Sequence, residues 1–284
     1  MDISDTPARS APRNSASPLF QRSELNGGPV EAEDFGALAL FNYGHFTSMQ
    51  VSDGRVRGLD LHMDRLKSAT RELFATSLDV DRVRNWMRSI VDAEPGTFSL
   101  RVTVFSRAMR REATAEPALI DVLTTIAPPR GGDKTPMRLK SFRYERALPH
   151  VKHVGTFALF HHRRLAQREG FGDALFVDSQ NRVSEASVWN IGFFDGSRVV
   201  WPNAPALKGI SMQLLDEGLR SRGIKRASVN IGRAELGNYR SAFLTNSSCP
   251  VRPIAAIDGV DFVVDHDFTA LLEESYAANP CQQI

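Results

Sequence analysis

The sequence predicts a mixed α/β protein of the α+β kind, divided into two domains of similar size. In both halves of the chain, stretches with helical spacing of apolar residues alternate irregularly with short runs rich in β-branched residues. Between the halves, residues 127–136 combine paired prolines and paired glycines with charges, which is typical of an exposed connection. The irregular alternation does not favour a doubly wound parallel sheet.

Domain boundaries follow from the same patterns. Residues 1–22 are rich in Ser, Pro, Ala and Arg without periodicity, so we expect a disordered tail there. We expect an N-terminal α+β domain over 23–127, a linker over 128–136 and a C-terminal α/β domain over 137–284.

In the first half, turn signals and periodicity define the elements. Asn26-Gly27-Gly28 and Asp53-Gly54 are typical of tight turns. Apolar residues recur at helical spacing between Leu59 and Phe74, which predicts an amphipathic helix. The other elements expected in this half are a strand over 42–51, a helix near 81–91 and strands over 98–105 and 118–126.

The second half repeats this mixture. We expect helices over 157–169, 212–222 and 268–277 and strands over 174–177, 183–184, 188–194, 198–201, 242–245 and 252–257. The half contains neither a G-x-G-x-x-G fingerprint nor a phosphate loop ending in Gly-Lys-Ser/Thr, which removes the simplest nucleotide-binding assignments.

Composition limits the classes of function. The 284 residues are 42% hydrophobic and 24% charged, which excludes disorder over most of the length. The net charge of +2 gives no electrostatic reason to expect nucleic acid or a membrane as partner. No apolar run approaches the roughly 18 residues of a membrane span, and Cys249 and Cys281 fit neither a metal site nor a disulfide framework. We therefore expect a cytoplasmic protein, without a metal, that acts on small molecules.

Three features of the second half carry chemistry. Lys152 stands in the apolar setting Val-Lys-His-Val; desolvation there would lower its pKa and free the amine for Schiff-base chemistry, although a surface lysine fits the spacing as well. Glu185 could pair with a protonated ring nitrogen or be a solvated charge. Gly209-Ile210-Ser211 begins a helix, where free N–H groups favour a phosphate or serve as a plain cap.

Taken together, these features resemble the class IV aminotransferase family, the fold-type IV pyridoxal 5'-phosphate (PLP) enzymes. This family includes branched-chain and D-amino-acid aminotransferases and 4-amino-4-deoxychorismate lyases. The resemblance covers roughly residues 24–275. Its motifs are, in order, His62-Met63-Asp64-Arg65-Leu66, Val151-Lys152-His153, Asp173 through Glu185 to Ile191, Leu207 to Ser211, and Phe243 to Ser248.

The resemblance implies a role for each motif. It makes Lys152 the catalytic Schiff-base residue, directs Arg65 to the cofactor phosphate and places Glu185 against the pyridine nitrogen. The further cofactor-binding residues that it implies are Leu207, Gly209, Ile210, Ser211, Asn246 and Ser247. Helix geometry agrees for Arg65, because that side chain falls about 90° from the centre of the apolar stripe and can reach a site beside the core.

Some residues depart from the family pattern. Phe157 replaces a tyrosine that contacts the phenolic oxygen of the cofactor in aminotransferases, and Lys208 replaces the usual proline of the phosphate loop. The segments around Lys152 and over 246–251 look closer to the aminodeoxychorismate lyases than to the branched-chain enzymes.

On the substrate side, Arg101 alternates with strand residues. It could present a two-pronged guanidinium to a carboxylate, or face outward as an ordinary strand arginine. Tyr43 and His45 are further candidates for the substrate pocket.

We therefore expect a PLP-dependent aminotransferase that takes a small amino donor and a keto-acid acceptor. The resemblance implies a homodimer with each site between the two domains. A lyase that eliminates pyruvate through the same lysine is the first alternative. The second is a homologue that binds PLP or another anion without turnover.

Overall fold

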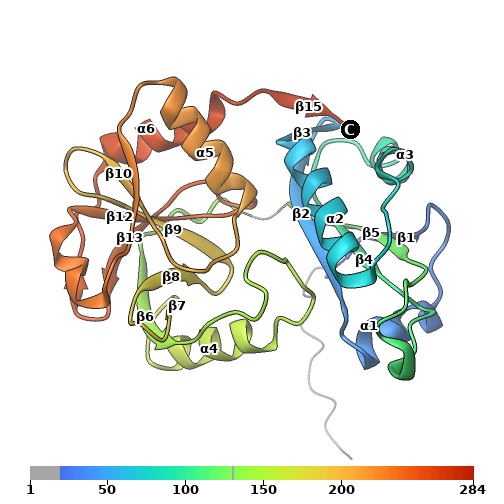
Figure 1. Ribbon diagram of the computed structural model, residues 1–284. Helices are drawn as coiled ribbons and strands as arrows, with labels where there is room; N and C mark the ends of the chain where they lie inside the picture. Colours follow the sequence, from blue (N-terminus) through green and yellow to red (C-terminus); the bar gives the residue numbers. More distant parts are fainter. Residues whose placement is uncertain (1–19, 130) are drawn as a thin grey trace, which may run out of the picture.

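The computed structural model describes residues 20–129 and 131–284. The sequence predicts a disordered tail over residues 1–22. Residues 1–19 of this segment lie outside the described residues, and Arg22 is the first residue of a strand. Two sheets, each with its own helices, lie side by side (Figure 1). None of the helices in the described ranges is long and apolar enough to cross a membrane.

The first sheet is antiparallel throughout and contains six strands in the described structure. Its strands, in spatial order, are β1 (Arg22–Leu25), β5 (Asp121–Ala127), β4 (Thr97–Phe105), β2 (Gly44–Ser52), β3 (Arg55–Arg57) and β15 (Cys281–Gln283). The turn between β2 and β3 is Asp53-Gly54, as predicted, and both residues have positive φ, which a tight hairpin of this kind requires.

Helices α2 (Leu59–Phe74) and α3 (Val80–Asp92) cover one face of this sheet. The apolar stripe of α2 is buried as its spacing predicts, and it packs with apolar side chains of β2, β4 and β5 in one core. Asp79 caps the start of α3 by accepting a hydrogen bond from the Arg82 N–H at 2.9 Å. A short helix, α1 (Gly36–Leu40), follows a 3-10 turn and precedes β2.

The second sheet is mixed, and it closes on itself because β8 pairs with β9. Its strands, in spatial order, are β11 (Arg226–Val229), β10 (Val199–Pro202), β9 (Trp189–Phe194), β12 (Ser241–Thr245), β13 (Arg252–Ile257), β6 (Met137–Arg143), β7 (Asp173–Val177) and β8 (Val183–Ala186), with β14 (Val260–Asp261) beside β13. Only the pairs β10–β11, β13–β6 and β6–β7 are parallel within the described residues.

Three helices belong to this half: α4 (Phe157–Arg168), α5 (Ile210–Ser221) and α6 (His266–Ala277). Helix α4 packs on β7 and β6, whereas α5 and α6 pack on each other and on the far part of the sheet. The consecutive strands β5 and β6 belong to different sheets, and the linker predicted at 128–136 falls between them.

The two halves are joined in three places besides the linker. Strand β15 leaves α6 and pairs with β3, so the last residues of the chain belong to the first sheet rather than to the second half (Figure 1). Ile284 is buried in the first core, and Arg88 donates to its carbonyl oxygen at 3.1 Å. At the start of α2, a Cβ on Gly58 would lie 3.1 Å from Leu214, so α2 and α5 approach closely.

The third connection positions the site. The loop between β6 and α4 is hydrogen bonded to the beginning of β2: the N–H of Phe46 donates to the Lys152 carbonyl at 2.9 Å, and the N–H of Val154 donates to the Gly44 carbonyl at 2.9 Å. The lysine singled out by the sequence is therefore fixed between the two sheets.

Candidate active site

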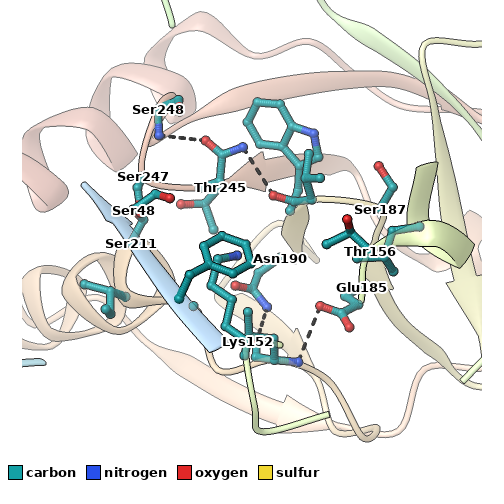
Figure 2. Close-up of a pocket in the computed structure, with 18 of the residues that line it drawn as sticks. Ser48, Lys152, Thr156, Glu185, Ser187, Asn190, Ser211, Thr245, Ser247 and Ser248 are labelled. Atoms are coloured by element: carbon teal, nitrogen blue, oxygen red, sulfur yellow. Dashed lines mark hydrogen bonds between the residues drawn. The ribbon is translucent and has the colours of Figure 1, made fainter. Parts of the chain in front are cut away.

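A cavity of about 280 Å³ is lined by residues of both halves. It brings together most of the predicted site residues, namely Arg65, Arg101, Lys152, Glu185, Leu207, Gly209, Ile210, Ser211, Asn246 and Ser247. Figure 2 shows Ser211, Thr245 and Ser247 on one side of this cavity and Thr156, Glu185 and Ser187 on the other, with Asn190 between them.

Lys152 supplies the only primary amine among the described lining residues. Its Nζ lies 5.0 Å from the centroid of the Phe46 ring. Burial lowers the pKa of Lys152 to about 7, and the neighbouring guanidinium groups of Arg65 and Arg146 act in the same direction. A large fraction of this amine is therefore uncharged at neutral pH, which is what a nucleophilic lysine requires.

Glu185 forms a buried ion pair with Arg146, with 2.9 Å between Arg146 Nε and Glu185 Oε1. The N–H of Leu207 approaches the other carboxylate oxygen at 3.4 Å. Burial raises the pKa of Glu185, while Arg146 opposes that rise. The guanidinium thus stabilises the ionised carboxylate inside the cavity wall.

The start of α5 forms the opposite wall. The Gln213 N–H donates back to the Gly209 carbonyl at 3.0 Å, so the N–H groups of the residues between them have no acceptor within the helix. Such a helix end attracts anions. Gly209 is needed here for space, because a Cβ on it would lie 2.0 Å from Asn190 Oδ1.

A loop after β12 completes this wall. Asn246 shapes the loop, since its side-chain oxygen accepts from the N–H groups of Ser248 and Cys249, both at 2.9 Å. The preceding residue, Thr245, lines the cavity and has a buried hydroxyl without a hydrogen-bond partner in the described structure. The loop and the helix start together offer backbone and hydroxyl donors, which suits a phosphate.

Arg65 reaches the cavity from α2. Its Nη2 donates to the Lys208 carbonyl at 2.8 Å, and burial lowers the pKa of Arg65 to about 10. Because this contact uses the backbone oxygen, the replacement of the usual proline by Lys208 does not prevent it. One turn earlier, His62 is buried and hydrogen bonded to Thr47 at 2.6 Å, which anchors this part of α2 to β2.

Arg101 enters the cavity from β4. Its guanidinium carbon lies 3.6 Å from the centroid of the Phe46 ring, and its Nε donates to the Thr103 hydroxyl at 3.1 Å. Arg101 therefore faces the site, which removes the alternative of an outward strand arginine.

The structure does not bring Tyr43 and His45 into the cavity lining. The Tyr43 hydroxyl donates to the Leu73 carbonyl at 3.0 Å, and His45 Nε2 lies 3.0 Å from the Thr70 hydroxyl. Both residues connect the beginning of β2 to the end of α2. Burial lowers the pKa of His45 to about 4, so its ring is neutral at physiological pH.

Phe157 also lies outside the lining. It is 78% exposed and stacks on His161, whereas its neighbour Thr156 lines the cavity. A tyrosine in the same orientation would likewise lie outside the cavity lining.

Sequence reasoning did not single out Arg146, and no motif in the printed sequence marks it. Its partnership with Glu185 spans 39 positions and exists only in the folded chain. Thr245 and Asn190 were part of the quoted motifs without an assigned role. Each is a polar residue in a largely apolar strand, β12 or β9, and that was the signal that could have found them.

Fold and site together define a class of protein: a two-sheet α/β protein with a buried lysine amine of lowered pKa between a buried carboxylate and the start of a helix. The family model for class IV amino-transferases matches residues 44–257. The chain therefore belongs to the class IV aminotransferase family, whose members are enzymes. No curated protein matches the chain in sequence.

Solved structures show the same fold. A branched-chain aminotransferase of Thermoproteus uzoniensis superimposes with a TM-score of 0.81 at 17% identity, covering 90% of this chain and 93% of that one. A candidate 4-amino-4-deoxychorismate lyase of Legionella pneumophila gives 0.77 at 20% identity, covering 86% and 93%. A PLP-bound hypothetical aminotransferase of Mycobacterium tuberculosis gives 0.76 at 19%, covering 90% and 98%.

Proposed function

We propose that this protein is a PLP-dependent aminotransferase that transfers an amino group from a small amino donor to a keto acid. The observation that carries the proposal is the amine of Lys152, with its pKa lowered to about 7, in a cavity between a buried carboxylate and an anion-binding wall. PLP offers an aldehyde, a basic ring nitrogen and a phosphate, and the cavity has a partner for each of these groups.

The residues present fit this cofactor. Arg65, the start of α5 and the loop from Thr245 to Ser247 would hold its phosphate, and the partnerless Thr245 hydroxyl would gain a hydrogen-bond partner there. Glu185 would hold a proton at the ring nitrogen. When bound, PLP supplies an electron sink that stabilises negative charge at the carbon next to the amino group.

The protein's own groups would then carry out proton transfer. Neutral Lys152 is placed to accept a proton from the substrate carbon and to return it elsewhere, because its lowered pKa lies close to the working pH. Arg146 would keep Glu185 ionised for its partner. Arg101 would orient a substrate carboxylate through two parallel hydrogen bonds.

A lyase reaction that eliminates pyruvate is the second candidate. The observation that favours it is the position of Phe157, which supplies no hydroxyl to the site and points away from it. The same lysine would move the proton in both reactions, and the fate of the substrate would differ.

We further propose that the protein forms a homodimer in the cytoplasm. Exposed apolar side chains near the cavity, Leu148, Phe157 and Phe160, support an interface on this side. Free Cys249 and Cys281 support a reducing compartment. Light scattering of the purified protein would test the assembly.

The reaction is tested with purified protein loaded with PLP. Amino donors should convert the cofactor to its amine form, seen in the absorption spectrum, and a keto acid should reverse the change, while Lys152→Ala should do neither. If aminodeoxychorismate instead releases pyruvate and 4-aminobenzoate without accumulation of the amine form, the aminotransferase proposal is wrong and the lyase is supported.

A further inference from the structure

One wall of the cavity has no part in holding the cofactor groups assigned above. This wall, the α4 wall, consists of three α4 residues and three residues at the connection between β8 and β9, namely Leu159, Phe160, Arg163, Ser187, Val188 and Trp189. Figure 2 shows Ser187 on the side of the cavity opposite Ser211 and Ser247. Because the proposed function uses none of the six for the aldehyde, ring nitrogen or phosphate, the α4 wall borders the space left for the substrate.

Trp189 is the largest side chain of the α4 wall, and its backbone is fixed. It is the first residue of β9 and pairs with Ala186 of β8, so Ser187 and Val188 form a two-residue turn between these strands. The Ser187 N–H donates to the Ala174 carbonyl at 3.1 Å. The turn that carries the indole is therefore tied to β7 as well.

A buried carboxylate holds the indole in one orientation. Trp189 Nε1 donates to Asp173 Oδ2 at 3.1 Å. Asp173 is fully buried, and its other oxygen accepts from Ser187 Oγ at 2.5 Å and from the Ala174 N–H at 2.7 Å. Arg163 Nε lies 3.8 Å from Asp173 Oδ2. The carboxylate cannot turn away without leaving buried donors unpaired, so the indole keeps its place.

The carbon atoms of the indole have little room to move. Trp189 is only 8% exposed and belongs to the apolar core of the second sheet, together with Ala186 and Ile191. Close-packed interiors resist added volume. Trp189 is therefore a rigid boundary of the cavity, which a substrate cannot push aside.

We propose that Trp189 is a specificity-determining residue that limits the length of the substrate's side chain, and that Asp173 is the positioning residue that fixes the indole. The inference rests on the proposed function, because that function assigns the other walls to the cofactor. Short amino donors fit between the cofactor and the α4 wall, whereas each further methylene group meets a ring that cannot move. A rigid apolar pocket discriminates by about tenfold or more for one methylene group.

O-alkyl hydroxylamines of different length measure this limit without turnover, because they condense directly with the aldehyde of PLP. The measured quantity is the length ratio, the rate constant for O-hexylhydroxylamine divided by that for O-methylhydroxylamine, followed by absorbance of the PLP-loaded protein. Free PLP in buffer gives the intrinsic length ratio. The variants are Trp189→Ala, Trp189→Phe and Asp173→Asn. Trp201→Phe is the matched control, because the Trp201 indole also donates to a carboxylate, Asp216 at 2.9 Å, but lies outside this cavity's lining.

We expect the parent's length ratio to lie at least about tenfold below that of free PLP. Trp189→Ala should raise it by at least about tenfold, because the space of the indole joins the cavity. Trp189→Phe, which is smaller and lacks the N–H, should give an intermediate ratio. Asp173→Asn should also raise the ratio, since one amide oxygen cannot accept from all three donors. Trp201→Phe should match the parent.

A parent length ratio equal to that of free PLP would refute the limit, and so would an unchanged ratio in folded Trp189→Ala. If Trp189→Ala does not fold, an unchanged ratio in Trp189→Phe refutes the limit instead. An unchanged ratio in Asp173→Asn would overturn the positioning role of Asp173. A general structural defect is distinguishable, because it would slow both hydroxylamines and leave their ratio unchanged.

Turnover separates the limit from the reaction. The second measurement is the ratio of kcat/KM for norleucine to that for alanine, each as both enantiomers. If no amino donor converts the cofactor but the hydroxylamine ratio depends on Trp189, the aminotransferase proposal fails and the limit stands. If amino transfer occurs and Trp189→Ala changes neither ratio, the reaction stands and the limit fails.

Discussion

The buried pair of Arg146 and Glu185 permits the most quantitative prediction. In Arg146→Met, the carboxylate of Glu185 remains in the cavity wall without its counter-ion. Removing one partner of a buried ion pair destabilises a protein by about 3–5 kcal/mol. For a chain of this size that corresponds to a fall in Tm on the order of 10 °C. Both side chains of the pair are only 5% exposed, so screening by solvent does not reduce this figure much.

The sign of the pH dependence follows from the same pair. Burial raises the pKa of Glu185, and loss of Arg146 removes the main interaction that opposes this rise. In the variant, the folded protein therefore retains a proton on Glu185 at pH values where the unfolded chain has lost it. Stability must then decrease as pH rises from the ordinary glutamate pKa through the raised one. The difference in Tm between parent and variant should thus be smallest near pH 4, at about the ordinary glutamate pKa, and should grow as the pH rises above it.

Thermal unfolding followed by circular dichroism across this pH range is the assay. The double variant Arg146→Met/Glu185→Leu is the control, because removal of both charges should recover much of the lost Tm. A Tm difference that is independent of pH, or a double variant no more stable than Arg146→Met, would refute the assignment of a mutually dependent buried pair.

Other predictions concern cofactor binding. The rate at which added PLP attaches to cofactor-free protein should rise with pH around a midpoint near 7, because the pKa of the Lys152 amine is lowered from 10.5 to about 7. Stopped-flow absorbance measures this rate. A midpoint above pH 9 would contradict the lowered pKa. Arg65→Ala should weaken PLP binding by about ten- to a hundredfold, whereas Arg71→Ala, which changes an exposed arginine of the same helix, should not. Equal affinities of parent and Arg65→Ala in fluorescence titration would show that Arg65 does not hold the cofactor. Phe157→Tyr should leave the spectral pKa of the bound cofactor unchanged, since this side chain is 78% exposed and outside the lining. A shifted pKa would contradict this placement of Phe157 at the start of α4.

The elements with strong local signals were predictable. Helix α2 has the bounds that its apolar spacing and Gly58 indicated, and the strands β4, β9, β12 and β13 lie within a few residues of the expected segments. These patterns are local: periodicity decides which face is buried, and turn residues decide where an element ends.

Elements that depend on distant partners were missed. Strand β6 has the alternating pattern Met-Arg-Leu-Lys, but it follows directly on the linker and was not predicted as a strand. Strands β3, β11 and β15 have three or four residues each, and β15 is a strand only because β3 lies beside it. Short strands carry little periodicity, so tertiary contact decides their conformation.

The site divides in the same way. Lys152, Glu185 and the α5 start were found through motifs that are contiguous in sequence, and the cavity unites them. Arg146 becomes a site residue only through the fold, because its partner Glu185 lies 39 positions away in the chain. The same is true of Arg163, because several separate segments together form the cavity that it lines.

The central claim is that Lys152 carries the cofactor, and reduction of the PLP-loaded protein with borohydride tests it most directly. The treatment fixes PLP to the lysine that holds it, and mass spectrometry of the digested protein locates the pyridoxyl group. The account predicts a single labelled peptide, the one containing Lys152, and no label in Lys152→Ala. A pyridoxyl group on another lysine, such as the exposed Lys208 beside the cavity, would contradict it.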